Sequence, residues 1–432
     1  MRLYSTKNKN QFTTLKEAVL KGLPDDNGLY MPEHIPTLPD DFIKNLKQHS
    51  FQSIGYEVAK TLLQGALPEK DLKTIVEHAI SFPAPLVEMD ENTFFLELFH
   101  GPSLAFKDFG ARFMAQLMGY FNREEKKELV ILVATSGDTG GAVAAGFYKT
   151  PGIKIVILYP SGKVSMLQEK QLTTLGENVT AIEVNGTFDD CQALVKKAFL
   201  DKTLTTRIRL SSANSINIAR LIPQSFYYFE AYKQLKDTNK QTVFSIPSGN
   251  FGNLTAGLLA KRMGLPVHRF IAATNVNDIV PKYLHTGDYA PKTSVRTLSN
   301  AMDVGNPSNF VRMNELYSGS WNKMKRDILG YAFDDAATQR AMIEVLEKYH
   351  YIMDPHGAVG YLALKQYRNH KKVNGIILET AHPAKFLDDV ESILKRKIDI
   401  PEKLAVLVDK KKISVEMNPD FESFKGWLME NY

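Results

Sequence analysis

The sequence contains little cysteine and no long uninterrupted hydrophobic run. Cys191 is the single cysteine among 432 residues, which excludes an internal disulfide framework and a zinc site built on several thiolates. A lone thiol suits a reducing compartment, so we expect a cytoplasmic protein. The most hydrophobic long stretch, 129–147, is interrupted by the polar and glycine-rich segment 136–141. It therefore falls short of a membrane span, and we expect no membrane anchor.

A large excess of charge of either sign is also absent. The chain has 53 lysines and arginines against 48 aspartates and glutamates, a formal net charge of +5. Because the basic residues are interspersed with acids, a dedicated nucleic-acid surface is not expected. The first residues, MRLYSTKNKNQFTT, lack the apolar core of a secretory signal. The small positive charge is compatible with an anionic small-molecule substrate.

From about residue 96 onward, short apolar runs alternate with glycine or polar turns and amphipathic helical patterns. Runs such as LVILVA are wholly apolar, which is typical of strands buried on both faces in a parallel sheet. The pattern predicts a doubly wound α/β architecture. The strand candidates are Leu129–Ala134, Ile153–Tyr159, Val179–Val184, Thr242–Ile246, Arg269–Ala273 and Gly375–Glu379.

Three units are expected along the chain. Residues 1–95 carry short helical patterns broken by prolines and predict a mainly helical N-terminal domain. Residues 96–236 and 237–432 predict two α/β lobes, joined near the helical run 216–235. Residues 275–325 are rich in Asn, Ser, Pro and Gly, and predict loops with short helices.

Lys107 is the candidate catalytic residue. It lies in HGPSLAFKDFGAR between Phe106 and Phe109. Apolar neighbours lower the pKa of a lysine, and a neutral amine can attack a carbonyl to form a Schiff base. Most lysines beside aromatic residues instead lay their stems on apolar surface and keep the ammonium in water. Two glycine-rich stretches further along favour the catalytic interpretation.

In FSIPSGNFGNLTAGLLAKR, a strand runs into a turn with Gly249 and Gly252 and then into a helix from about Asn253. Unpaired amides and the positive end of a helix dipole favour a phosphate at such a turn. The motif is neither GxGxxG nor a Walker A loop, which disfavours a nucleoside triphosphate. Since glycine turns are common in α/β sheets, an ordinary strand-to-helix connection has the same pattern.

A similar turn, ATSGDTGGAVAAG, follows the Leu129–Ala134 strand and adds the hydroxyls of Thr135, Ser136 and Thr139. It predicts a second anion site. Asp138 is unexpected there, because a carboxylate repels an anion unless it is protonated or turned to another partner. Close packing of the small residues against the sheet is the alternative explanation of this motif.

Thr380 ends the strand candidate GIILET, so its hydroxyl should lie at the carboxyl edge of the sheet, where α/β proteins bind ligands. A neutral hydroxyl there can hydrogen-bond a ring nitrogen without protonating it. Glu379 should point to the opposite face, because strand side chains alternate.

Taken together, these motifs resemble the threonine synthases, pyridoxal-phosphate enzymes of fold type II. The specific parts are HGPSLAFKDFGAR and SGDTGGA, with SSANSINIARLIPQ at 211–224, and the likeness extends from GLYMPEHIP to ETAHPAKF. Relatives such as cysteine synthase usually read SGNTG, so Asp138 matches the long-chain threonine synthases instead. The resemblance implies two mostly parallel doubly wound lobes plus the N-terminal region.

The resemblance also implies roles for individual residues. Lys107 would carry pyridoxal 5'-phosphate covalently, and Thr380 would face the pyridine nitrogen, where other such enzymes commonly place Asp or Arg. The cofactor phosphate would lie on Gly249, Asn250, Phe251, Gly252 and Asn253. The substrate amino acid would contact Ser136, Asp138 and Thr139. Candidates for the substrate phosphate are Asn214, Ser215, Asn217 and Arg220, with Lys163 as a weaker one. An arginine on a helix is more often a surface ion-pair residue.

The implied reaction converts O-phospho-L-homoserine and water to L-threonine and phosphate, with no metal, in a monomer or homodimer. Two alternatives stay open from the residues. Another pyridoxal-phosphate lyase, such as a serine or threonine dehydratase or a lyase giving 2-oxobutyrate, would share the cofactor loops. A non-catalytic α/β protein that binds a phosphorylated metabolite, with Lys107 merely packed, would share the turns.

Overall fold

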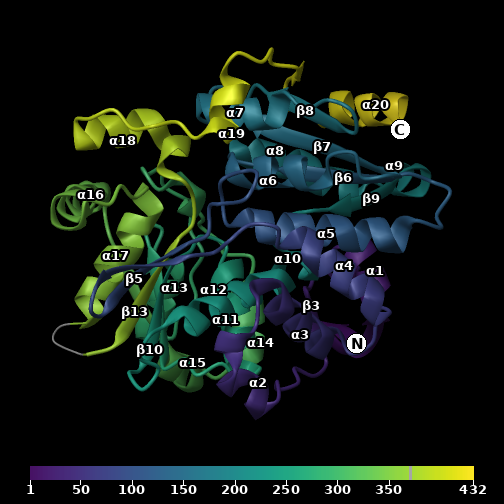
Figure 1. Ribbon diagram of the computed structural model, residues 1–432. Helices are drawn as coiled ribbons and strands as arrows, with labels where there is room; N and C mark the ends of the chain where they lie inside the picture. Colours follow the sequence, from purple (N-terminus) through teal and green to yellow (C-terminus); the bar gives the residue numbers. More distant parts are fainter. Residues whose placement is uncertain (369–371) are drawn as a thin grey trace.

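The computed structural model describes residues 1–368 and 372–432. Two sheets with helices on their faces make up most of the molecule (Figure 1). The first has the strand order β14-β8-β7-β6-β9, and every neighbouring pair is parallel. Its strands are β6 (Leu129–Ala134), β7 (Ile153–Pro160), β8 (Val179–Val184), β9 (Arg209–Ser212) and β14 (Val415–Met417).

The second sheet has the order β12-β11-β10-β13-β5-β4. Its strands are β4 (Leu86–Asp90), β5 (Thr93–Glu97), β10 (Thr242–Pro247), β11 (Arg269–Thr274), β12 (Ile328–Ala332) and β13 (Asn374–Glu379). All pairs are parallel except β4 with β5. The α/β prediction and the six predicted strands are confirmed, with bounds that differ by at most one residue.

Helices fill the connections between these strands. In chain order they are α1 (Leu15–Lys21), α2 (Asp40–Lys44), α3 (Phe51–Leu63), α4 (Glu69–Ala79), α5 (Lys107–Asn122), α6 (Asp138–Phe147), α7 (Met166–Thr173), α8 (Phe188–Leu200), α9 (Lys202–Arg207), α10 (Ile218–Leu221), α11 (Phe226–Gln234), α12 (Gly252–Arg262), α13 (Ile279–Thr286), α14 (Phe310–Leu316), α15 (Trp321–Asp327), α16 (Asp335–Tyr349), α17 (Pro355–Arg368), α18 (Leu387–Leu394), α19 (Glu402–Val408) and α20 (Phe421–Asn431). The described residues also form four 3-10 turns, which are η1 (Leu46–Gln48), η2 (Ile222–Ser225), η3 (Asn300–Met302) and η4 (Pro383–Phe386).

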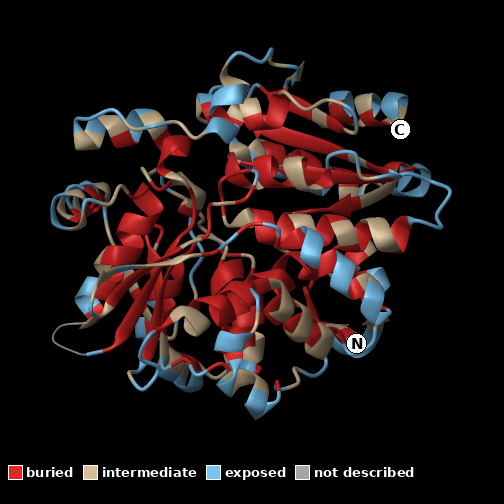
Figure 2. Ribbon diagram, viewed as in Figure 1, coloured by how far each residue is buried: buried red, intermediate tan, exposed pale blue. Residues whose placement is uncertain are grey.

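The hydrophobic core follows the two sheets. Every residue of β6, β10 and β13 is buried, as the apolar runs predict for strands covered on both faces. Buried residues line the sheets and the inner helix faces, whereas exposed residues lie mostly at the periphery (Figure 2). α5 packs against α6 on one side and against α1 and α4 of the N-terminal region on the other. None of the described helices is both long and apolar enough to cross a bilayer.

Sheet membership crosses the three expected domain ranges. β4 and β5 come from residues 86–97 but extend the second sheet, where Thr93 lies beside Gly375. β14 comes from the C-terminal part but pairs with β8 in the first sheet, and α20 packs on α8. Residues 1–80 also contain a three-stranded antiparallel sheet of β1 (Arg2–Ser5), β2 (Asn8–Thr14) and β3 (Tyr30–Pro32). Short strands whose partners are distant in sequence carry no local signal of their pairing.

Candidate active site

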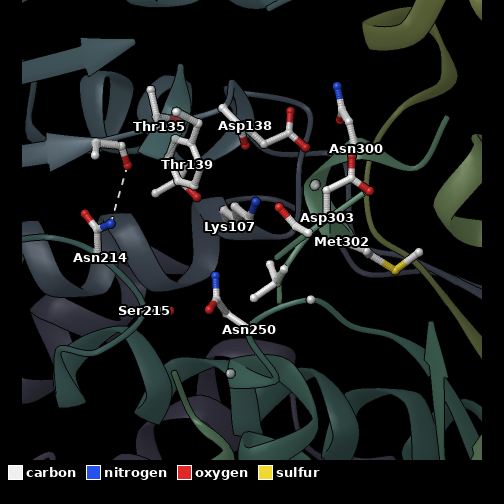
Figure 3. Close-up of a pocket in the computed structure, with 18 of the residues that line it drawn as sticks. Lys107, Thr135, Asp138, Thr139, Asn214, Ser215, Asn250, Asn300, Met302 and Asp303 are labelled. Atoms are coloured by element: carbon white, nitrogen blue, oxygen red, sulfur yellow. Dashed lines mark hydrogen bonds between the residues drawn. The ribbon is translucent and has the colours of Figure 1, made fainter. Parts of the chain in front are cut away.

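A cavity of about 420 Å³ opens at the carboxyl ends of β6, β10 and β13, next to the N-termini of α5, α6 and α12. Lys107 lies near its centre, with Asp138 and Thr139 on one side and Asn250 on the other (Figure 3). The cavity brings together nearly all the site residues expected from the sequence. These are Lys107, Ser136, Asp138, Thr139, Asn214, Ser215, Arg220, Gly249, Asn250, Phe251, Gly252, Asn253 and Thr380.

Lys107 is the first residue of α5 and is partly exposed, because its side chain borders the cavity. Burial lowers its pKa to about 8. The nearby carboxylate of Asp138 raises this pKa, whereas the positive charges of Arg220 and Lys385 lower it further. About a tenth of the amine is therefore neutral at pH 7, far more than for an ordinary lysine, and this is the nucleophilic form.

The two phenylalanines that flank Lys107 in the sequence play different parts. The Lys107 ammonium lies 5.7 Å from the centroid of the Phe106 ring. Phe109 is fully buried and contacts the rings of Phe51, Phe82 and Tyr227 instead. Two residues along a helix point about 200° apart, so positions 107 and 109 cannot share a face. Phe106 is therefore the flanking ring beside the Lys107 ammonium, and the Phe109 ring packs among core aromatic residues.

The turn between β10 and α12 presents a run of free amides to the cavity. Phe251 adopts a left-handed conformation with φ of 59° directly before α12. Within the described part of the chain, the backbone N–H groups of residues 249–253 have no hydrogen-bond acceptor, whereas Leu254 N–H donates to the side chain of Asn253. Free amides at a helix N-terminus are the donors that a phosphate requires.

The side chain of Asn253 stiffens this turn. Its Oδ1 accepts a 2.8 Å hydrogen bond from Ser248, and its Nδ2 donates to the carbonyl of Pro247 at 2.9 Å. Gly249 is required by close packing, because a Cβ there would lie 2.8 Å from the carbonyl oxygen of Ala301. The turn is therefore preformed by protein contacts alone.

The loop between β6 and α6 forms the opposite wall. Thr135 Oγ1 accepts hydrogen bonds from the N–H groups of Gly137 at 3.0 Å and Gly140 at 2.9 Å, which leaves Ser136 and Thr139 lining the cavity. Gly137 has φ of 136°, a conformation that favours glycine. This geometry matches the turn expected from the sequence.

Asp138 is turned to another partner, one of the two outcomes considered from the sequence. Its Oδ1 lies 2.9 Å from the ammonium of Lys385 and accepts a 2.9 Å hydrogen bond from Gln168. Burial pushes the pKa of Asp138 upward, but the charges of Lys385 and Lys107 and these hydrogen bonds together hold it well below its usual range. The carboxylate is ionised at neutral pH.

Arg220 is buried at the cavity wall, not exposed as a surface ion-pair residue. Its Nη1 donates to the carbonyl of Ala213 at 2.6 Å, and its Nε has no partner among the described residues. Burial lowers its pKa to about 10, partly opposed by Asp108. It remains a cation beside the cavity.

Unlike the other predicted site residues, Asn217 is not among the residues that line the cavity. Its Nδ2 donates to the carbonyls of Val19 at 3.0 Å and Ser212 at 3.3 Å, and its Oδ1 accepts from Ala219 N–H at the start of α10. An asparagine that caps a helix and one that binds a ligand look alike in a sequence.

Thr380 lines the cavity at the end of β13, and Glu379 faces away from it, as strand alternation predicts. The carboxyl group of Glu379 packs against Gly357, where a Cβ would lie 2.3 Å from Oε1. Burial raises the pKa of Glu379 well above its usual value, and Asp354 and Glu97 add to the shift.

Several cavity residues were not anticipated from the sequence. Lys163, the weaker candidate named from the sequence, also lines the cavity. The polar lining residues that were not anticipated are Thr187, Gln192, Ser294, Arg296, Asn300, Asp303 and His356. His356 accepts a 3.2 Å hydrogen bond from Ala301 N–H and pairs with Asp354, so it supports the turn η3 beside Gly249. Four of the unanticipated residues, Ser294, Arg296, Asn300 and Asp303, lie in the segment 275–325, for which the sequence predicts loops with short helices. No cluster of three or more potential metal ligands occurs among the described residues.

Comparisons with known proteins agree with this geometry. The family model for pyridoxal-phosphate dependent enzymes matches residues 81–377. Models for the threonine synthase N terminus and the threonine synthase C-terminal region match residues 2–80 and 357–427.

The chain belongs to the threonine synthase family. It is 46% identical to the threonine synthase of Escherichia coli over 433 residues, which cover all of both chains. It is 35% identical to that of Saccharomyces cerevisiae, over 96% of this chain and 95% of the relative.

Solved structures give the same result. The crystal structure of the Escherichia coli threonine synthase matches with a TM-score of 0.93 at 45% identity and covers all of both chains. A threonine synthase from Brucella melitensis with bound pyridoxal phosphate also matches with a TM-score of 0.93, at 33% identity, covering 100% of this chain and 99% of the relative. A tomato threonine deaminase, at 17% identity and a TM-score of 0.59, shares the fold alone.

Pyridoxal phosphate is the cofactor of this threonine synthase family member, and the cavity has the groups to hold it. An amine with a lowered pKa, a cradle of unpaired amides and a neutral hydroxyl line one cavity. Gly249 supplies the close backbone approach that a phosphate cradle requires.

Proposed function

We propose that this chain converts O-phospho-L-homoserine and water to L-threonine and phosphate. The observation that carries the proposal is that Lys107 and two anion-binding turns border the same cavity. The full-length likeness to curated threonine synthases supports the same reaction. One turn suits the phosphate of the cofactor, and the other the carboxylate of an amino acid.

The cofactor site is proposed as follows. Bound pyridoxal phosphate withdraws electrons from an amino acid joined to it and so acidifies the C–H bonds next to the reacting centre. The amides of residues 249–253 would hold its phosphate, and the Thr380 hydroxyl would hydrogen-bond its ring nitrogen. A hydroxyl cannot supply the full negative charge that stabilises a protonated ring nitrogen. Other groups must therefore position the protons that move during the reaction.

Lys107 is proposed as the acid and base. A group that both takes and gives protons works best with a pKa near the working pH, and a pKa of about 8 meets this condition. Its amine would take the proton from the α carbon and return a proton later in the turnover. Between these steps the β carbon loses a proton, the bond from the γ carbon to the phosphate oxygen breaks so that phosphate leaves, and the γ carbon gains a proton. Water then adds its hydroxyl at the β carbon, and the remaining proton of the water goes to the released phosphate.

The substrate anions have separate proposed sites. The loop at 136–139 offers N–H groups and hydroxyls to the carboxylate of the amino acid. Arg220 would bind the substrate phosphate, together with Asn214 and Ser215 on the same wall. The buried guanidinium with a free Nε supports this role, because a cation kept out of water without a carboxylate partner needs an anion.

Replacement of Lys107 tests the proposal. The Lys107→Ala variant should bind pyridoxal phosphate only reversibly, resist trapping by borohydride and release neither phosphate nor threonine. The matched control is Lys261→Ala, since Lys261 pairs with Asp327 outside the cavity and should keep full activity. Threonine formation by Lys107→Ala would refute the role.

Product analysis of the unaltered enzyme separates the rival functions. Accumulation of 2-oxobutyrate in place of threonine would identify another lyase. A purified protein that neither absorbs visible light nor traps the cofactor on borohydride treatment would identify a non-catalytic binding protein.

We also propose that the enzyme works in the cytoplasm as a monomer or homodimer, without nucleic acid. The near balance of charge and the single buried cysteine support this proposal. Light scattering of the purified chain tests the oligomeric state.

A further inference from the structure

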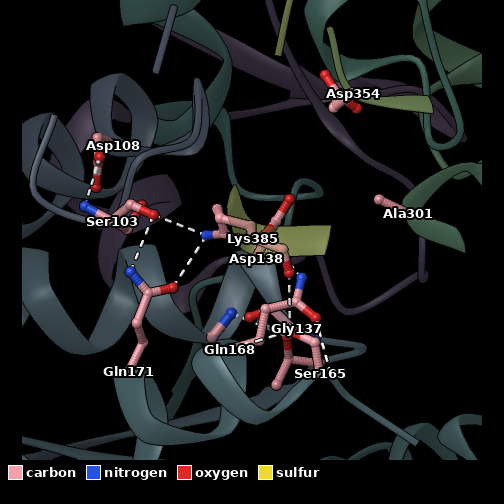
Figure 4. Close-up of polar contacts among 12 residues, drawn as sticks. Ser103, Asp108, Gly137, Asp138, Ser165, Gln168, Gln171, Ala301, Asp354 and Lys385 are labelled. Atoms are coloured by element: carbon pink, nitrogen blue, oxygen red, sulfur yellow. Dashed lines mark hydrogen bonds and ion pairs between the residues drawn. The ribbon is translucent and has the colours of Figure 1, made fainter. Parts of the chain in front are cut away.

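Lys385 is a fully buried lysine in the turn η4, directly behind the candidate active site. Its ammonium donates to the carbonyl of Ser103 at 2.7 Å and to Gln171 Oε1 at 3.0 Å, and it pairs with Asp138 Oδ1 at 2.9 Å (Figure 4). These contacts use all three N–H bonds of the ammonium. The charge is therefore held in one place by three separate elements.

The Asp138 carboxylate has two different sides. Its Oδ1 is occupied by Lys385 and Gln168. No described residue donates a hydrogen bond to Oδ2, and the side chain lines the same cavity as Lys107. Lys385 therefore neutralises the carboxylate through Oδ1, while Asp138 also borders the cavity that contains Lys107 and raises the pKa of that lysine.

Stability alone does not explain a charge at this position. Lysine is almost never fully buried unless it is paired, and a buried ion pair is often no more stabilising than well-packed apolar side chains of similar volume. The contacts of Lys385 also link parts of both lobes, since Ser103 precedes α5, Gln171 lies on α7 and Lys385 follows β13. Such a costly arrangement beside the cavity indicates a role in the site.

We propose that Lys385 is a positioning residue that keeps Asp138 ionised and neutralised, so that Asp138 does not hold Lys107 as an ammonium ion. This inference depends on one part of the proposed function, namely that Lys107 is the reacting amine. Without Lys385, the cation left beside the buried carboxylate is Lys107, and the pair would trap the amine in its non-nucleophilic form.

Other charged groups surround the two lysines. Lys163, Asp189, Arg296 and Asp303 line the same cavity as Lys107. Arg220 faces Lys107 from α10. Asp108 and His382 lie within the field of Lys385, and burial lowers the pKa of His382 to about 4, so it carries no charge at neutral pH. Asp138 is the carboxylate that pairs with Lys385 and raises the pKa of Lys107, and the charge of Lys385 also lowers that pKa directly.

The test measures the protonation of Lys107 directly in the full-length, cofactor-free chain. An amine-reactive reagent is applied across a range of pH, and labelling of the peptide containing Lys107 is quantified by mass spectrometry. In Lys385→Met, the midpoint of labelling should rise by about one pH unit or more. In Asp138→Asn, where Lys385 keeps its charge, the midpoint should fall.

The double variant Asp138→Asn/Lys385→Met removes both charges and should return the midpoint close to that of the unaltered chain. General loosening of the fold would not shift the labelling midpoints of the two single variants in opposite directions, and it would not restore the midpoint in the double variant. The matched control is Lys425→Met, whose ion pair with Asp201 lies outside the cavity and which should leave the midpoint unchanged. Circular dichroism checks that each variant is folded.

Unchanged midpoints in Lys385→Met or in Asp138→Asn would overturn the inference. If Lys385→Met does not fold, Asp138→Asn and the double variant still test the inference. Only the charge model predicts that Asp138→Asn lowers the midpoint of Lys107 labelling and that adding Lys385→Met raises it again. The readout is independent of turnover. If the unaltered enzyme makes no threonine but the midpoints shift as stated, the proposed function fails and the inference stands.

Discussion

The backbone N–H of Phe106 donates a 2.8 Å hydrogen bond to the carbonyl oxygen of Thr380. An isolated antiparallel bridge between Ala105 and Ala381 lies next to it. The start of α5 is thereby joined to the end of β13 by backbone contacts, and side-chain substitutions leave this junction intact. Lys107 and the Thr380 hydroxyl consequently keep a fixed position relative to each other. A rigid planar cofactor that is held at both groups requires such a fixed arrangement.

The lowered pKa of Lys107 predicts how cofactor uptake depends on pH. Only the neutral amine reacts with an aldehyde, so the rate of uptake should rise about tenfold per pH unit below the pKa and level off above about 8. The growth of visible absorption after mixing the cofactor-free chain with pyridoxal phosphate measures this rate. A rate that still climbs beyond pH 10 would mean that Lys107 behaves as an exposed lysine.

Gly249→Ala should weaken cofactor binding. Its new Cβ would lie 2.8 Å from the carbonyl oxygen of Ala301 and 2.9 Å from the Cα of Met302, so the turn η3 or the phosphate turn must move. Overpacking of this kind costs about 1–3 kcal/mol, which corresponds to a roughly 5- to 150-fold higher Kd for pyridoxal phosphate in a fluorescence titration.

The matched control for that change is Gly426→Ala in α20, where a Cβ meets no atom within 4 Å. This variant should keep the Kd and gain a few tenths of a kcal/mol in stability, because alanine favours a helix over glycine. Equal Kd values for the two variants would show that the 249–253 turn is not the phosphate site.

Arg220→Ala should raise the KM for the phosphorylated substrate about 10- to 100-fold, because a charge-assisted hydrogen bond contributes about 1.5–3 kcal/mol. The Kd for pyridoxal phosphate should stay within about twofold, since a different turn holds the cofactor. Steady-state kinetics and cofactor titration separate these two quantities. A parallel loss of both would assign Arg220 to the cofactor instead.

Gly110→Ala offers an independent test of the same residue. A Cβ at Gly110 would lie 2.8 Å from Arg220 Nε and 2.9 Å from the Arg220 carbonyl oxygen, so it should displace the guanidinium and raise the KM. Gly119→Ala on the same helix meets only a methyl group of Thr150 at 3.2 Å and serves as the control. An unchanged KM in Gly110→Ala would contradict the proposed position of the substrate phosphate.

The sequence predicted those parts of the molecule that depend on local pattern. LVILVA reads as a strand because every residue is apolar, and the turns at Gly137 and Gly249 follow from glycine between a strand and a helix. The pairing of β5 with β13 was missed because the two strands are far apart in the chain. Lys385 was missed because a lysine becomes informative only when its burial is known.

Arg312 is a second residue whose importance only the structure shows. It is fully buried on α14, and burial lowers its pKa to about 9. Its guanidinium donates to the carbonyls of Tyr30 at 3.1 and 3.2 Å and of Ile216 at 2.6 Å, and to Asn309 Oδ1 at 2.8 Å. One side chain thus ties the N-terminal region to the segment that precedes Arg220.

Arg312→Met should therefore lower the free energy of unfolding by about 3 kcal/mol, because it leaves buried carbonyl oxygens without donors. Urea unfolding followed by tryptophan fluorescence measures this change, with the two tryptophans of the chain as probes. Arg262→Met is the control, since the guanidinium of Arg262 is exposed and its loss should change stability by no more than about 0.5 kcal/mol. Equal effects of the two substitutions would mean that the Arg312 contacts contribute nothing beyond those of a surface arginine.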